Sequence, residues 1–446
     1  MDRLAPTPCA TACPPDPPPK EQTLSAMTET PSMPALGRER VTSARTAVFV
    51  AFALAGLVFA SWASRIADTK AALGLTAGEL GVTLLAASVG SVTGLPLAGR
   101  VSDRIGATRT VATGIGVALV GLLAVALVVD ARGSRLLVAA GLFLVGLGVG
   151  LWDVAMNLEG ADVERQLGVS VMPRFHAAFS GGTVVSALIG SAMSWAGVSL
   201  FLHYLGAVVV TVGFAVWALP RFLPRSAEHH ERAKAARQRH RSAWLEPRTL
   251  LVGVVVFASA FTEGTANDWL AVAFVEGHDL PAWAGVLGFA TFLTFMTVAR
   301  LVGTGLIDRF GRVPVLRVSF GLAALGAALV ILGTPWLAFV GAAVWGVGAA
   351  LGFPVGMSAS ADEPHRAAAR MSVVATIGYV AFIAGPPVLG FLGDEVGVLR
   401  SLSVVGALAL LALAVVPSVR EPVPGHAARA PDRATPATAV DGGPSS

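Results

Sequence analysis

The chain has 446 residues, of which 54% are hydrophobic and 13% are charged, and its mean hydropathy is +0.70. A soluble protein needs about a quarter of its residues charged to cover its surface, so this composition excludes an ordinary soluble protein. In a membrane protein, arginines in cytoplasmic loops would account for the net charge of +4, and we expect no nucleic-acid partner. The two cysteines, Cys9 and Cys13, have no downstream Cys or His cluster, so we expect no metal site.

Long apolar segments follow one another along the chain, separated by short polar turns. A hydrocarbon core of ~30 Å is crossed by about 20 helical residues, and the lack of apolar–polar alternation argues against a barrel. We therefore predict an all-α integral membrane protein with twelve transmembrane helices in two six-helix bundles. The predicted spans are 46–64, 78–98, 110–129, 136–158, 175–196, 199–219, 249–273, 282–302, 316–333, 335–357, 371–393 and 398–416.

Three polar stretches lie outside these spans. Residues 1–45 and 418–446 are rich in Pro and Ala and are predicted to be disordered tails. Residues 220–248 carry a run of Arg and His and are predicted to form a cytoplasmic linker between a first bundle at 46–219 and a second at 249–417.

The distribution of Lys and Arg predicts the orientation. If the N-terminus is cytoplasmic, the inner loops hold 18 basic residues and the outer loops hold 5. Because basic residues are retained on the cytoplasmic side, we expect both termini to lie inside a cell (inner or plasma) membrane.

A short motif occurs once in each half, between the second and third spans and again between the eighth and ninth. Asp103-Arg104-Ile-Gly106 is the first copy and Asp308-Arg309-Phe-Gly311 is the second. Equivalent loops in two six-helix sets indicate parallel repeats related by an axis along the membrane normal. Glycine suits the tight turn, and the Asp can face a helix N-terminus. The arginines can pair with it and with carboxylates of the other half, so that these loops act as gates.

These loops resemble the signature of the major facilitator superfamily, over residues 46–417. The positions that match are Gly99, Asp103, Arg104, Gly106 and Arg109 in the first copy and Leu306, Asp308, Arg309, Gly311 and Arg312 in the second. The resemblance implies two bundles that rock around a central site, in a transporter that is not an enzyme and uses no cofactor. We expect it to act as a monomer on a small-molecule substrate.

A narrower resemblance is to a bacterial branch of permeases similar to the fucose–proton symporters. It is carried by segments such as Trp152–Asn157, His176–Gly182 and Glu263–Trp269. Those symporters have an acid and an Asn four residues apart in the fourth helix, matched here by Asp153 and Asn157. They also have an acid in the first helix, where this chain has an apolar residue near Ala63.

Ionisable groups within a span are costly, so each is a functional candidate. Asp153 and Asn157 share a helix face; they could bind a polyol or take up a proton, or form a structural hydrogen bond. Glu263, near the middle of its span, is the first candidate for proton coupling, because a carboxyl group held away from water is harder to ionise. Alternatively, it pairs permanently with Arg65 or Arg300. Asn267 lies one turn further on, and Asp268 is expected to be an interfacial acid.

Other candidates lie at span ends. Arg65 could bind an anionic group or reach the membrane interface, and Arg300 is expected to belong to the loop gate. His176, at the start of the fifth span, suits a pH switch or a structural role. Three aromatic residues could stack on a sugar ring or simply pack, namely Trp152, Trp269 and Tyr379.

The sequence therefore predicts a secondary active transporter of a small solute, with proton coupling and sugar-like uptake as the favoured form. No Gly-x4-Gly-Lys-Ser/Thr loop is present, so ATP is not a direct energy source. A proton-driven exporter of a drug or metabolite is the alternative, although the Gly-Pro-x-x-Gly-Gly run of drug antiporters is missing from the fifth span. A membrane sensor that no longer transports is the third hypothesis.

Overall fold

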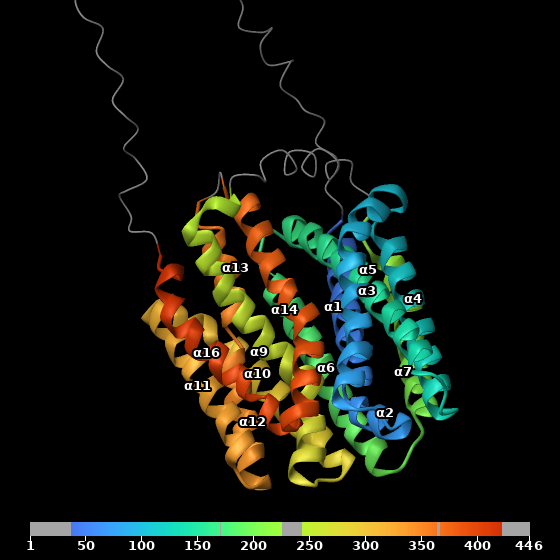
Figure 1. Ribbon diagram of the computed structural model, residues 1–446. Helices are drawn as coiled ribbons and strands as arrows, with labels where there is room; N and C mark the ends of the chain where they lie inside the picture. Colours follow the sequence, from blue (N-terminus) through green and yellow to red (C-terminus); the bar gives the residue numbers. More distant parts are fainter. Residues whose placement is uncertain (1–36, 170, 225–242, 364–365, 422–446) are drawn as a thin grey trace, which may run out of the picture.

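The computed structural model describes residues 37–169, 171–224, 243–363 and 366–421, and within these it is entirely helical (Figure 1). Twelve helices in these ranges are long and apolar enough to cross a membrane, which confirms the predicted all-α membrane architecture. The first half comprises α1 (Arg38–Ala63), α2 (Ile66–Leu73), α3 (Ala77–Ile105), α4 (Ala107–Asp130), α5 (Arg135–Leu167), α6 (Met172–Trp195), α7 (Leu200–Ala218) and η1 (Leu219–Arg221).

The second half repeats this organisation. It comprises η3 (Ala243–Leu245), α9 (Pro247–His278), α10 (Ala282–Phe310), α11 (Arg312–Leu332), α12 (Pro335–Ala349), α13 (Gly352–Ser360), α14 (Ala367–Val396), α15 (Val398–Ser401), α16 (Ser403–Val415) and η4 (Val416–Val419). The tenth span consists of α12 and α13 together, and the helix is interrupted at Ala350 and Leu351.

Several helices extend beyond the apolar segments that predicted them. α1 begins at Arg38, inside the stretch expected to be a tail, because Arg40 there donates to the carbonyl oxygens of Pro220 and Phe222. α9 continues to His278, beyond the predicted end at residue 273. The rest of the predicted tails, at 1–36 and 422–446, and residues 225–242 of the predicted linker lie outside the described residues.

The molecule has two distinct ends. At one end, α1 begins beside the end of α7, and Arg248 at the start of α9 donates to the carbonyl oxygens of Ser418 and Arg420. We call this the terminal end, and it is uppermost in Figure 1. The opposite end, which carries α2, is called the far end.

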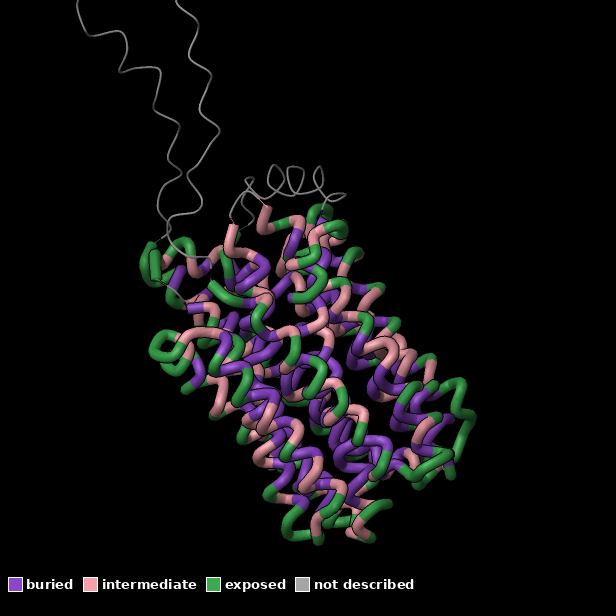
Figure 2. The backbone as a smooth tube through the Cα atoms, turned by 60° about the vertical axis from the view of Figure 1, so that its left-hand side comes forward, coloured by how far each residue is buried: buried purple, intermediate pink, exposed green. Residues whose placement is uncertain are grey.

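Within each half, glycine permits close helix packing. A Cβ added at Gly146 on α5 would collide with the carbonyl oxygen of Ala87 on α3, and one at Gly326 on α11 would collide with the backbone of Trp345 on α12. Such small-residue contacts are the usual way in which membrane helices pack tightly. Buried residues accordingly lie along helix faces that are turned toward other helices (Figure 2).

The two halves meet through α3 with α14 and through α6 with α10. At the far end they pack tightly: a Cβ at Gly81 would collide with the carbonyl oxygen of Pro386. Toward the terminal end, side chains on these same helices are exposed, including His176 on α6 and Ser372 and Thr376 on α14. The halves are therefore closed at the far end and open toward the terminal end.

Candidate functional site

An ion pair lies midway along α9. Arg300 Nη2 on α10 is 2.7 Å from Glu263 Oε2, and both side chains are partly buried, with 30% and 19% of their surfaces exposed. Arg300 Nε also donates to the carbonyl oxygen of Ala350 at 3.2 Å. That carbonyl is at the break between α12 and α13. Arg300 therefore links a carboxylate in the membrane to the interruption of the tenth span. The sequence-based expectation that Arg300 belongs to the loop gate is wrong.

The first half contributes the acid–amide pair on α5. Asn157 Nδ2 donates to the backbone oxygen of Asp153 at 2.8 Å and to its Oδ1 at 3.2 Å, so the two side chains share one face as predicted. Tyr379, on α14 of the second half, lies close enough to Asp153 for the two groups to interact electrostatically. The acid–amide pair therefore lies within electrostatic reach of the second half.

His176 is a second residue of the first half that lies within electrostatic reach of the second half. This exposed residue of α6 packs its ring edge on Phe52, with centroids 5.1 Å apart, and lies within electrostatic reach of Arg300. Polar side chains of both halves thus converge on the space between them: Asp153, Asn157 and His176 from the first, and Glu263, Arg300 and Tyr379 from the second.

Asp268 is not the interfacial acid that the sequence predicted. α9 continues for nearly three further turns to His278, so Asp268 lies within the helix and is half-buried. Within the described part of the chain its carboxylate has no hydrogen-bond or ion-pair partner. Asn267 is also half-buried, and its Oδ1 is a buried atom without a partner.

Arg65 is held inside the first half rather than exposed to solute or lipid. Only 4% of its side chain is exposed, its Nε lies 2.6 Å from Asp68 Oδ2, and its Nη2 donates to the carbonyl oxygen of Val198 at 2.8 Å. The alternative pairing of Arg65 with Glu263 is therefore wrong. Trp152 and Trp269 are fully buried in helix packing, which leaves half-buried Tyr379 as the aromatic candidate for stacking.

The repeated loops form the turns that the motif predicted. Gly106, between α3 and α4, has φ +86°, and Gly311, between α10 and α11, has φ +78°. Only glycine adopts such angles without strain. Asp103, Arg104 and Arg109 in the first copy and Asp308 and Arg309 in the second are exposed at the terminal end, whereas Gly99 is an ordinary helical residue of α3.

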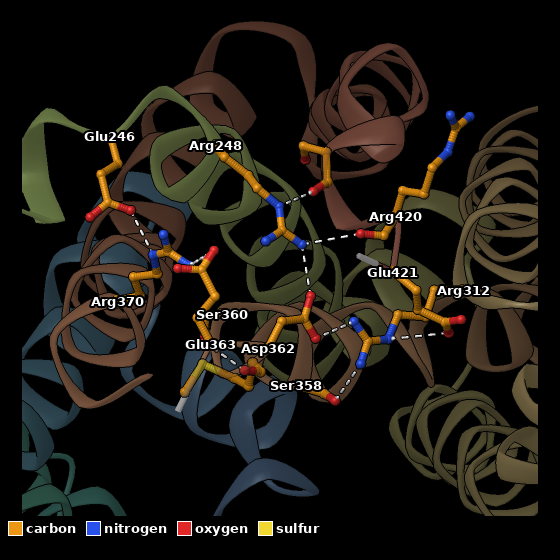
Figure 3. A network of polar contacts seen from close by, with 12 residues as sticks. Glu246, Arg248, Arg312, Ser358, Ser360, Asp362, Glu363, Arg370, Arg420 and Glu421 are labelled. Atoms are coloured by element: carbon orange, nitrogen blue, oxygen red, sulfur yellow. Dashed lines mark hydrogen bonds and ion pairs between the residues drawn. The ribbon is translucent and has the colours of Figure 1, made fainter. Parts of the chain in front are cut away.

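Arg312 shows a different pairing from the one predicted. Its guanidinium binds Asp362 at 2.8 Å and lies 3.7 Å from Glu421, and both acids belong to its own half (Figure 3). Asp362 also accepts from Arg248 at 2.7 Å and is 7% exposed. The two arginines thus join the starts of α9 and α11 to the end of α13.

A second acid extends this network. Glu246 binds Arg370 Nε at 2.6 Å, and Arg370 reaches Glu363 at 3.0 Å (Figure 3). Glu246 also pairs with Arg366. These contacts tie the start of α9 to the start of α14. In the first half, buried Glu159 accepts from the backbone N–H of Leu223. Each half is therefore braced internally at the terminal end, where the halves are separated from each other.

Contacts between the halves occur at the far end. Asp394 Oδ2 on α14 accepts from the backbone N–H of Gly78 at 2.9 Å and from Thr76 Oγ1 at 3.1 Å, both at the N-terminus of α3. Lys70 pairs with Glu276, and Ser191 Oγ donates to the carbonyl oxygen of Trp283 at 2.8 Å. We call these three contacts the far-end latch. Sequence reasoning missed it, because its members are ordinary polar residues of loops and helix ends.

Comparison with known proteins identifies the family. The model of the Major Facilitator Superfamily matches residues 46–303 and 284–442. An uncharacterized MFS-type transporter of Yersinia pestis is 30% identical over 375 residues, covering 83% of this chain and 94% of that protein. The membrane protein MosC of Rhizobium meliloti is 26% identical over 374 residues, covering 82% and 88%.

Solved structures share the fold at low sequence identity. A mutant of the nucleoside transporter NupG matches with a TM-score of 0.70 at 14% identity, over 85% of this chain and 99% of that one. A D-xylose-proton symporter matches with a TM-score of 0.64 at 14% identity, over 83% and 97%. The prediction of a transporter rather than an enzyme is thereby confirmed, and the chain belongs to the Major Facilitator Superfamily of multi-pass membrane transporters.

Proposed function

We propose that this transporter couples the movement of a proton to the uptake of a small, sugar-like solute, as the fucose–proton symporters that it resembles do. The observation that carries the proposal is the Glu263–Arg300 ion pair within the membrane. Protonation of Glu263 neutralises the carboxylate, and Arg300 then loses its partner. Because Arg300 also holds the carbonyl oxygen of Ala350, the protonation state of Glu263 acts on the break in the tenth span.

In this proposal, Asp153 and Asn157 bind the solute. An acid and an amide on one helix face provide acceptors and donors for hydroxyl groups, and Tyr379, within electrostatic reach of Asp153, provides an aromatic ring from the other half. The same pattern in the fucose–proton symporters supports a sugar-like solute. One copy of the chain holds all these groups, so we expect the monomer to transport.

The open end is assigned to the cytoplasm. The loops at the terminal end carry most of the Lys and Arg residues, and such loops stay cytoplasmic. In this assignment both termini lie on the cytoplasmic side of the inner membrane of a bacterium, and the structure represents an inward-facing state. The far-end latch closes the outer side and must open during each transport cycle.

The proposal is tested in proteoliposomes with an acidic exterior and an alkaline interior. Hexoses, pentoses, polyols and nucleosides are offered separately, and the proposal expects at least one to accumulate above its external concentration until the proton gradient is collapsed. Accumulation only when the gradient is inverted would support the exporter instead. If no solute of this panel moves in either direction, drugs and metabolites are offered next, and lack of movement for all of them would support the sensor.

A further inference from the structure

An apolar groove runs along the second half between α10 and α11, with a volume of about 570 Å³. α10 contributes a line of exposed side chains that includes Phe295, Val298, Val302 and Leu306. α11 contributes the exposed Val318, and the buried Val315 forms part of the floor. From Phe295 to Phe310, α10 rises about 22 Å, which is close to half the thickness of a bilayer including headgroups. The groove therefore extends over about one leaflet.

This groove faces the membrane and not the site between the halves. Arg300, which reaches Glu263, lies about 200° around α10 from Val298 and from Val302. In a chain that spans a membrane, exposed apolar side chains on the side away from the central site contact lipid. An acyl chain is thus the available occupant for most of the groove.

A positive charge lies at the terminal end of the groove. Arg309 follows Val302 and Leu306 on the same face of α10 at helical spacing. Its guanidinium is 5.1 Å from the ring centroid of Phe310, which itself lines the groove. Arg312 binds Asp362, but Arg309 has no acidic partner among the residues that the structure describes. The adjacent Asp308 is about 100° away around the helix.

We propose that this groove binds one phospholipid, with an acyl chain along α10 and its phosphate on Arg309. Arginine is suited to this role because its planar fork of N–H groups matches phosphate oxygens. Arg309 lies at the depth of the lipid headgroups, where it can bind the phosphate. The apolar side chains of the groove, deeper in the membrane, provide an apolar surface for the acyl chain. The site is independent of the central residues, so it does not rest on proton coupling.

The test uses purified full-length protein in detergent and phosphatidylglycerol as the probe, with retained lipid counted by native mass spectrometry. The wild type is expected to retain one phosphatidylglycerol, and Arg309→Gln to bind it about tenfold more weakly, as the loss of a charged hydrogen bond implies. Arg317→Gln is the matched control, because Arg317 is also exposed but lies about 200° around α11 from Val315 and Ser319. It should bind as the wild type does.

Two further measurements separate headgroup from chain and guard against misfolding. Diacylglycerol, which has no phosphate, should bind the wild type as weakly as phosphatidylglycerol binds Arg309→Gln. In nanodiscs, phosphatidylglycerol with a photoreactive acyl chain should label residues 295–310 and 314–322, and Leu306→Trp should remove that labelling. Equal binding by Arg309→Gln and Arg317→Gln would overturn the proposal, as would labelling spread over all helices or a second copy cross-linked across the groove.

Discussion

Asp394, near the end of α14, accepts a hydrogen bond from the backbone N–H of Gly78 at the first turn of α3, although the two residues belong to different halves. The carboxylate lies at a helix N-terminus, where negative charge is favourable. We expect Asp394→Ala to weaken the far-end latch by ~1 kcal/mol, a shift of about fivefold toward the state open at the far end. We would measure the distance between spin labels placed at positions Leu136 and Leu332, one in each half at the far end. In Asp394→Ala, a larger fraction of molecules should show the long distance.

The labels require a background in which Cys9 and Cys13 are replaced by serine. Glu395→Ala is the control, because Glu395 is the exposed neighbour of Asp394 and has no described partner. Identical distance distributions for Asp394→Ala and the background would show that the contact does not hold the far end closed.

Close packing at the far end can be tested without removing a charge. A Cβ at Gly81 would collide with the carbonyl oxygen of Pro386, whereas one at Gly116 on α4 would meet no atom within 4 Å. Gly81→Ala should therefore shift the same spin-label distances in the same direction as Asp394→Ala, and Gly116→Ala should leave them unchanged. A shift toward shorter distances in Gly81→Ala would contradict the inferred closure.

The Glu263–Arg300 pair should show a measurable interaction energy. In a double-mutant cycle of Glu263→Gln and Arg300→Gln, we expect the double variant to be less destabilised than the sum of the single variants, by ~1–2 kcal/mol. Unfolding of the purified protein in detergent is the measurement. The cycle of Glu263→Gln with Arg317→Gln should be additive, and additivity in both cycles would mean that the pair contributes nothing to stability.

The network at the terminal end should matter for stability rather than for solute recognition. Asp362→Asn leaves Arg248 and Arg312 without their shared carboxylate, and each lost charged hydrogen bond is worth about 1.5–3 kcal/mol. The unfolding temperature should fall by several degrees, whereas Asp308→Asn should not change it, because Asp308 is exposed and has no described partner. An unfolding temperature that stays the same in Asp362→Asn would contradict the assigned role.

The membrane architecture could be predicted from the sequence because its causes are local. Spans are set by runs of apolar residues, and the turns are set by glycines such as Gly106 and Gly311, whose positive φ angles the repeated motif indicated. Helix ends were less accurate. Polar residues continue a helix once they find partners, as Arg40 does with Pro220, and those partners are distant in sequence.

The central residues could also be predicted from the sequence, but most of their partners could not. Asp153 and Asn157 are four residues apart on one helix, so their contact follows from helical geometry. Whether Glu263 pairs with Arg65 or with Arg300 depends on how three helices pack. Arg65 forms its ion pair with Asp68 instead. The latch between Asp394 and Gly78 joins residues more than 300 positions apart, and no sequence spacing indicates it.

Proton coupling through Glu263 is tested most directly by proton movement in proteoliposomes, with internal pH monitored while each solute of the panel is added outside. We expect solute-dependent acidification for the wild type and none for Glu263→Gln, while Glu395→Gln, which removes an exposed charge without a described partner at the far end, still acidifies. Acidification by Glu263→Gln at the wild-type rate would contradict the assignment of the proton to α9. Solute uptake by the wild type without any acidification would contradict proton coupling itself.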